Sequence, residues 1–126
     1  MTRSFAKYKL QLLEIKQNLI NQMDVMTSHF NQINKSVGDE SDQSLAHQEE
    51  HAFLVAQART KQRILEIEYA LARIENGTFG ICEETSEPIE EERLNALPWT
   101  RFSIEGAEIQ ETENYHPLHK RKLNFA

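Results

Sequence analysis

Residues 76–106 read NGTFGICEETSEPIEEERLNALPWTRFSIEG, and the spacing inside this stretch decides how the rest of the chain is interpreted. Cys82 and Thr85 are separated by two residues, and Ser103 and Gly106 repeat that separation further along. Two Cys-x2-Cys pairs at this distance would be typical of a tetrahedral zinc site, yet Cys82 is the single cysteine of the chain. The stretch is therefore either a metal site that lacks its ligands or part of another kind of fold.

Composition limits the classes of protein to consider. The 126 residues suffice for one modest domain, and 39% hydrophobic with 27% charged residues is typical of soluble proteins. The apolar runs are too short for a membrane span, and the first residues lack the apolar stretch of a secretory signal. A single cysteine excludes an internal disulfide and favours a reducing compartment. We therefore expect a cytoplasmic protein with no membrane association.

The net charge of −6 argues against direct nucleic-acid binding, which requires a surface that neutralises phosphates. Any role on DNA or RNA should therefore run through a protein partner. An acidic run at 82–92 and a basic run at 116–122 are explained equally well as solvated surface. The chain has neither a Gly-rich phosphate loop nor a nucleophile–base arrangement, so we expect a protein that is not an enzyme.

Two long amphipathic helices precede the quoted stretch. Apolar residues recur at steps of three and four from Phe5 to Ile33 and again from Phe53 to Ile74. The connection at residues 36–44 is short, so the helices must be antiparallel neighbours.

We predict a long antiparallel coiled-coil hairpin over residues 1–75, with its tip at 36–44. At ~1.5 Å per residue the hairpin should project about 45 Å. Folding it about the tip places Leu19 opposite Thr60. A coiled-coil dimerisation arm would show the same periodicity, so the pattern alone leaves that alternative open.

The apolar residues cluster more closely after Gly77, which predicts a small globular region over residues 76–114. Short helices are expected over 90–96 and from Ile104 to about Glu113, and a flexible tail over 115–126. The predicted core of this region consists of Phe79, Ile81, Leu94, Trp99 and Phe102.

Three stretches together resemble the DksA/TraR group of bacterial transcription regulators: ALARIENGTFGIC, EPIEEERLNALPW and GDESDQS. The resemblance implies a mainly α fold, in which a long coiled-coil hairpin joins a degenerate zinc-finger-like globular part and a C-terminal helix. It also implies binding to bacterial RNA polymerase, with the hairpin in the secondary channel and the tip near the active site. Family members of this kind act on transcription initiation and in the stringent response.

At the tip, the family motif Asp-x-x-Asp-x-Ala matches Asp39, Asp42 and Ser44, with serine in place of alanine. Two carboxylates at the end of a thin rod can reach a buried, cation-rich site and accept hydrogen bonds there. The same two acids can also cap the second helix, where negative charge is favoured. The two roles are compatible.

The resemblance places the four zinc-binding cysteines of the family at Cys82, Thr85, Ser103 and Gly106. Thr, Ser and Gly supply no thiolate or imidazole, so we expect no zinc and a zinc-independent fold. Packing of the predicted core, together with a Thr85–Ser103 hydrogen bond, should replace the metal.

The resemblance also places Glu66, Leu97 and Ala107 where long-hairpin relatives hold the alarmone ppGpp with basic residues. None of the three is basic, and a carboxylate at position 66 repels a polyphosphate. We therefore expect a weak response to ppGpp.

Three functions remain open from the sequence. The first is a monomeric regulator of initiation that binds RNA polymerase. The second is a transcript-cleavage factor, because proteins of that kind also present carboxylates at a hairpin tip, where they hold a magnesium ion. The third is a structural coiled-coil dimerisation module.

Overall fold

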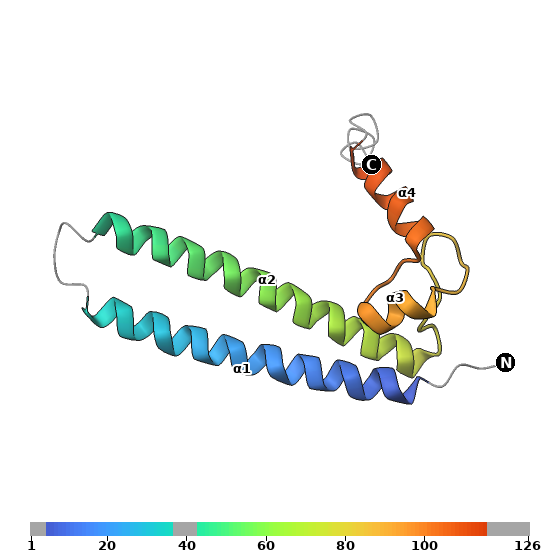
Figure 1. Cartoon of the computed structure of the whole chain (residues 1–126), viewed down its shortest axis with the longest axis horizontal. Helices are drawn as coiled ribbons and strands as arrows, with labels where there is room; N and C mark the ends of the chain where they lie inside the picture. The colour runs from blue at the N-terminus through green and yellow to red at the C-terminus, as the bar shows by residue number, and fades with distance from the viewer. Residues whose placement is uncertain (1–4, 37–42, 116–126) are drawn as a thin grey trace.

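The structure, a computed structural model, describes residues 5–36 and 43–115. It contains the helices α1 (Ala6–Ser36), α2 (Gln43–Asn76), α3 (Glu91–Ala96) and α4 (Ile104–Tyr115). Within these ranges the only extended pairing outside the helices is an isolated antiparallel bridge between Ile81 and Pro88. The prediction of a mainly α fold, a long hairpin with a small globular part and a C-terminal helix, is confirmed (Figure 1).

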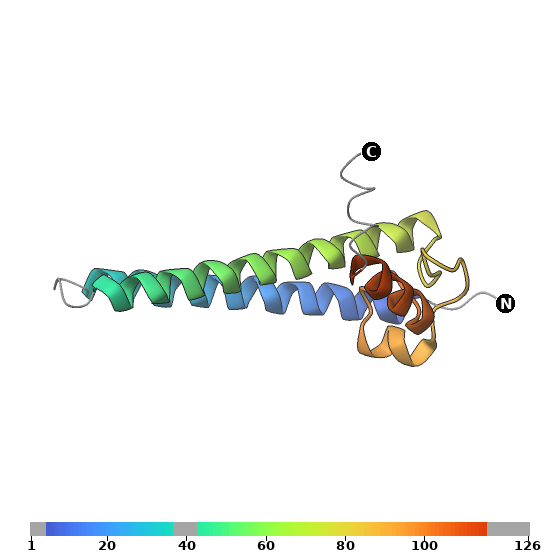
Figure 2. The same cartoon turned by 90° about the horizontal axis from the view of Figure 1, so that it is seen from above.

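α1 and α2 run side by side in opposite directions and form the hairpin, while α3 and α4 lie at its base (Figures 1 and 2). The helices span 31 and 34 residues, and neither contains a glycine or proline that would interrupt it. The Asn76-Gly77 pair is a sequence signal for the end of a helix, and α2 does end there: Gly77 adopts a φ of 79° and the Thr78 amide donates to the Arg73 carbonyl at 2.9 Å.

Polar pairs between the two helices fix their register. Salt bridges join Lys9 to Glu75 at 3.6 Å and Lys16 to Glu68 at 3.4 Å. Nearer the tip, the Gln57 amide donates to the Thr27 hydroxyl at 3.3 Å, and the rings of Phe30 and Phe53 stack with centroids 4.3 Å apart. These contacts follow one antiparallel register along the whole described hairpin.

The predicted pairing of Leu19 with Thr60 was wrong by about one helical turn. In the register set by Lys16–Glu68 and Thr27–Gln57, Leu19 lies opposite the turn that contains Ile64. The sequence did not define how many residues the connection uses, and each residue of error shifts the predicted pairing.

The buried core lies at the base of the hairpin, where both helices meet the globular part. Tyr8 and Leu12 come from α1, and Ile67 and Ala70 from α2. The ring of Phe79 packs against those of Phe5 and Tyr8, with centroids 5.0 and 5.6 Å apart. The other buried members of this cluster, among the described residues, are Cys82, Ile89 and Leu94.

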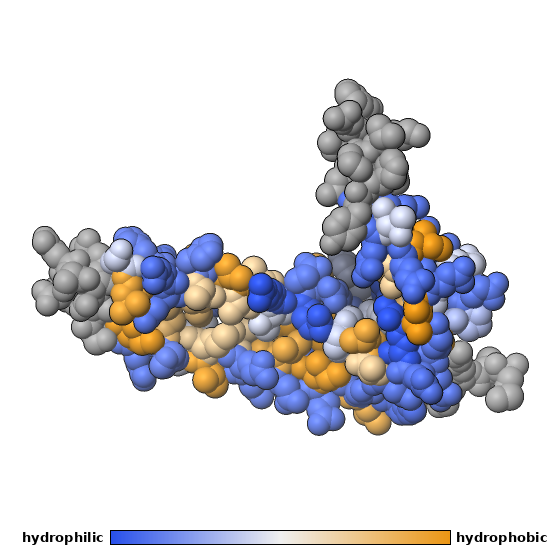
Figure 3. Space-filling view, turned by 45° about the horizontal axis from the view of Figure 1, so that its top comes forward, coloured by the Kyte–Doolittle hydropathy of each residue, from blue (hydrophilic) through white to orange (hydrophobic). Residues whose placement is uncertain are grey.

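The outer half of the hairpin is much less protected. A two-helix rod buries a single stripe, and Met23, Met26, Phe30 and Phe53 in that half are only partly covered. Figure 3 shows apolar side chains exposed along the hairpin between hydrophilic flanks. Stability should therefore be concentrated at the base.

The predicted globular core is only partly correct. Phe79 and Leu94 are buried, and the partly buried Trp99 and Phe102 pack against the core. Ile81, however, is 43% exposed, and its place in the predicted core was wrong. It lies on the extended bridge next to the buried Cys82, and neighbouring residues on an extended chain point to opposite sides.

No helix in the described part of the chain combines the length and apolar character that a membrane crossing requires.

Candidate functional site

The four positions of the family zinc site converge at the base of α4. Cys82 is 1% exposed and Ser103 6% exposed, and Gly106 is also buried. The hydroxyls of Ser103 and Thr85 both make hydrogen bonds with the sulfur of Cys82. A Cβ on Gly106 would collide with Cys82 Sγ, so α4 packs directly on the sulfur.

Hydrogen bonds set the ionisation of this thiol. Burial raises the pKa of Cys82, but the bonds from Ser103 and Thr85, through both side chain and backbone, lower it to about 6 from 9.0. The predicted direct bond between Thr85 and Ser103 is not present among the described residues. Instead, Thr85 Oγ1 accepts a bond from the Glu87 amide at 3.3 Å, and Ser103 Oγ accepts one from the Gly106 amide at 3.0 Å.

A second feature is a cleft of about 370 Å³ between α2 and the chain around α3. Two of the predicted ppGpp positions, Glu66 and Leu97, line it, whereas Ala107 lies on α4 and is not part of its lining. Arg63 lies beside this cleft, with its guanidinium 4.1 Å from the centre of the Trp99 ring and its Nε 3.3 Å from Glu66 Oε2. This stacked, paired arginine ties α2 to Trp99.

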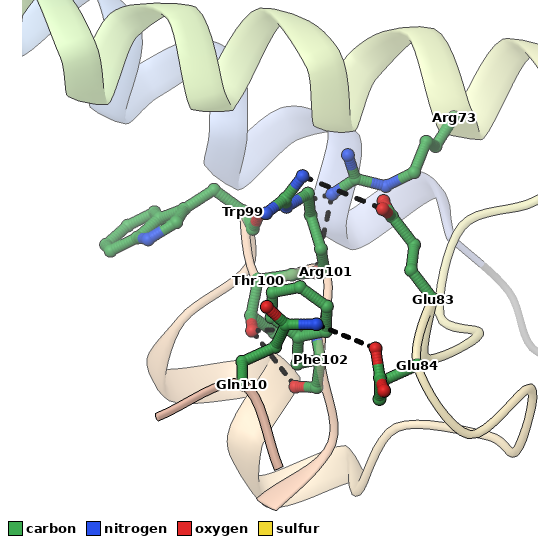
Figure 4. A network of polar contacts seen from close by, with 8 residues as sticks. All are labelled: Arg73, Glu83, Glu84, Trp99, Thr100, Arg101, Phe102 and Gln110. Atoms are coloured by element: carbon green, nitrogen blue, oxygen red, sulfur yellow. Dashed lines mark hydrogen bonds and ion pairs between the residues drawn. The ribbon is translucent and has the colours of Figure 1, made fainter. Parts of the chain in front are cut away.

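Arg73, Arg93 and Arg101 line the cleft, and each already has a partner; Figure 4 shows those of Arg73 and Arg101. Arg73 Nη2 donates to the carbonyls of Trp99 and Thr100 at 3.1 and 3.3 Å. Arg93 Nε donates to the Phe102 carbonyl at 2.7 Å, and Arg101 pairs with Glu83 at 3.7 Å. The cations of the cleft are therefore engaged with the protein itself.

Burial lowers the pKa of Arg73 below its ordinary value; the nearby Glu83 raises this pKa and Arg101 lowers it. An arginine remains charged despite such a shift.

The tip is described only in part. Asp39 and Asp42 lie outside the described residues, and the predicted flexible tail, residues 115–126, lies outside them beyond Tyr115. Ser44 is exposed in the first turn of α2.

Sequence reasoning missed the contacts of Arg63 and Arg73 with Trp99 and Thr100. Arginines on the polar face of a helix carry no signal for a partner that lies more than twenty residues away.

The chain was compared with known families and proteins. A family pattern described as "Prokaryotic dksA/traR C4-type zinc finger" matches residues 77–111. An RNA polymerase-binding transcription factor DksA from Caulobacter vibrioides is 31% identical over 109 residues, covering 86% of this chain and 77% of the relative. General stress protein 16O from Bacillus subtilis is 31% identical over 100 residues, covering 71% of this chain and 61% of that protein.

The fold matches as well. The structure of transcription factor DksA2 from Pseudomonas aeruginosa superposes with a TM-score of 0.78 at 28% identity, over 86% of this chain and 84% of that chain. Sequence and fold together define a hairpin protein with a zinc-finger-type base. The chain belongs to the DksA/TraR family.

The match corrects the expectation of a chain without zinc. A C4-type zinc finger implies zinc binding, so that expectation is contradicted and was wrong. The expectation considered only the four ligand positions, whereas the family pattern matches all of residues 77–111. The residues at those positions do not make a four-thiolate set, because only Cys82 carries a thiol. In the described ranges no three His, Cys, Asp or Glu side chains gather as metal ligands.

Proposed function

We propose that this protein is a DksA-like regulator of transcription initiation that binds bacterial RNA polymerase through the secondary channel. In this proposal the hairpin enters the channel and its acidic tip, Asp39 and Asp42, lies near the active site. The protein acts in the cytoplasm as a monomer, has no enzymatic activity of its own and does not bind nucleic acid directly. The net charge of −6 supports the last point.

The observation that carries the proposal is the shape of the hairpin. Its longer helix has 34 residues, which at ~1.5 Å per residue gives a rod of about 50 Å and two helices in width. Such a rod can enter a narrow channel that excludes a globular domain. Relatives of this chain include a protein named as an RNA polymerase-binding transcription factor.

The exposed apolar side chains on the outer hairpin also support insertion. Val25, Leu45 and Leu54 are 68%, 56% and 53% exposed. Covering exposed apolar side chains with a partner removes them from water and so favours formation of the complex. A channel wall would cover both sides of the rod at once.

The arrangement of charges in the cleft supports a weak response to ppGpp. Glu66 contributes a carboxylate, and the arginines around it are already bonded to Glu66, Glu83 or backbone carbonyls. A polyphosphate would have to displace these partners and approach a negative charge, which reduces its affinity.

Transcription in vitro with purified bacterial RNA polymerase on a ribosomal promoter tests the proposal. The wild-type protein should bind the polymerase and change the lifetime of promoter complexes. Asp42→Asn should bind nearly as well and lose the effect, while the matched control Asp24→Asn, an exposed acid on α1, should keep it.

Two results would count against this function. Release of short RNA fragments from stalled elongation complexes would indicate a transcript-cleavage factor. A stable dimer in sedimentation, with no polymerase binding, would indicate a dimerisation module.

A further inference from the structure

The direction of α4 depends on chain segments outside the hairpin. Within the described chain, α4 makes hydrogen bonds with three residues outside the helix, namely Glu84, Glu90 and Ser103. Gln110 Nε2 donates to Glu84 Oε2 at 2.7 Å, the Ile104 amide to Glu90 Oε1 at 3.1 Å and the Gly106 amide to Ser103 Oγ at 3.0 Å. The orientation of α4 relative to the hairpin is therefore transmitted through the globular part.

Besides the packing of Phe79 on Phe5 and Tyr8, two groups of side-chain hydrogen bonds in the described chain connect that globular part to the hairpin. On one side, the Tyr8 hydroxyl and the Gln11 amide of α1 contact Asn95 in α3 at 3.1 and 3.3 Å. On the other side, Arg73 of α2 reaches the connecting segment between α3 and α4 (residues 97–103). The first link fixes α3, and the second fixes the segment that leads directly into α4.

Arg73 is well suited to hold this segment. Its Nη2 donates to two successive carbonyls, those of Trp99 and Thr100, as seen in Figure 4. A nitrogen of a charged guanidinium makes stronger hydrogen bonds than a neutral donor. The neighbouring pair of Glu83 and Arg101 adds one charge of each sign beside it, so the cluster joins α2, the turn at Glu83 and the connecting segment.

Trp99 is held at both ends. Arg73 binds its carbonyl, and Arg63, located almost three helical turns earlier on α2, stacks on its ring at 4.1 Å. Without Arg73, the segment would keep its bonds inside the globular part, from Arg93 to the Phe102 carbonyl and from the Glu83 amide to the Arg101 carbonyl. Of the contacts described here between this segment and α2, the stacking of Arg63 on the Trp99 ring would remain.

We propose that Arg73 is a positioning residue that fixes the angle between the hairpin and the α4-bearing globular part. A tilt of about 10° at the base of a rod of about 50 Å displaces its far end by about 9 Å. The consequence for transcription rests on the proposed function, because only a tip that must reach one place is sensitive to such a displacement.

Distances between spin labels test the angle itself. Labels on cysteines introduced at the exposed Lys61 of α2 and Glu108 of α4 report the hairpin-to-α4 distance, and a pair at Glu14 and Lys61 reports the hairpin alone. The parent protein checks that the buried Cys82 takes up no label. In Arg73→Gln we expect the Lys61–Glu108 distribution to widen at least twofold while the Glu14–Lys61 distribution stays unchanged.

Two further variants keep this test decisive. Arg73→Lys keeps the charge with a shorter side chain, and an intermediate width is expected. Arg59→Gln, an exposed arginine on the same helix, should match the wild type. An unchanged distribution in both Arg73 variants overturns the proposal. Equal widening of both label pairs also overturns it, because the change would then be general unfolding.

The transcription assay separates this inference from the proposed function. We expect Arg73→Gln to reduce the effect on promoter complexes about tenfold, with Arg73→Lys in between. If the wild type binds no polymerase, the proposed function fails while the distance result still stands. If the distribution widens and transcription is unaffected, Arg73 does fix the angle, and the inferred consequence of that angle for transcription is overturned.

Discussion

At the scale of single residues, Cys82 is the most unusual group in the described chain. It is 1% exposed, yet two hydroxyls bond to its sulfur and Gly106 packs against it. The donors outweigh burial and bring its pKa to about 6. An isolated apolar pocket would have the opposite effect.

Ser103→Ala removes one of these donors, so we expect the pKa of Cys82 to rise from about 6 toward its ordinary value. Thiolate absorbance in the ultraviolet, followed during a pH titration of chelator-treated protein, measures this shift. Cys82→Ser provides the baseline. An unchanged pKa in Ser103→Ala would show that Thr85 and the backbone suffice.

The same pKa has a consequence for stability. Because folding depresses the pKa below its value of 9.0 in the unfolded chain, the contribution is fully present above pH 9.0 and is lost as the pH falls through about 6. The free energy of unfolding should therefore rise between these values in the wild type and stay flatter in Cys82→Ser. Urea unfolding at both ends of the range measures the difference.

At the scale of elements, the hairpin is unevenly stabilised. Leu12 and Ile67 at the base are 0% exposed, whereas the Phe30–Phe53 stack near the tip is only partly covered. Salt bridges such as Lys16–Glu68 join partly exposed side chains and contribute little. The base should therefore determine the stability of the whole hairpin.

Leu12→Ala should lower the free energy of unfolding by about 2–5 kcal/mol, because it leaves a cavity in the packed base. The matched change Leu54→Ala, at a side chain that is 53% exposed, should alter it by less than about 0.5 kcal/mol. Urea denaturation of both variants measures these values. Equal losses at the two sites would contradict an uneven hairpin.

At the scale of the whole molecule, the cleft and α4 lie at the base of the hairpin, far from its tip (Figure 1). Two of the positions that the family resemblance assigns to ppGpp, Glu66 and Leu97, line the cleft, and the proposed weak response to ppGpp rests on Glu66 and the paired arginines around it. A substitution in this cleft should therefore alter the response to ppGpp without altering the structure of the hairpin.

Glu66→Lys should increase the response to ppGpp severalfold, because it removes a repulsive charge, adds an attractive one and frees Arg63. Glu68→Lys breaks the comparable Lys16–Glu68 pair on the hairpin and serves as the control. Transcription from a ribosomal promoter with and without ppGpp measures both. Strong synergy in the wild type would contradict the expected weak response.

The sequence by itself determined the two long helices, the stop at Gly77 and the spacing around Cys82 that carries the family resemblance. These features are local, since helical periodicity and glycine turns depend on neighbours along the chain. Only the tertiary structure decided the exposure of Ile81 and the register of the hairpin. The same is true of the hydrogen bonds from Arg73 to the carbonyls of Trp99 and Thr100. Each of these depends on residues that are distant in sequence and become neighbours only when the base packs, so no local pattern could encode them.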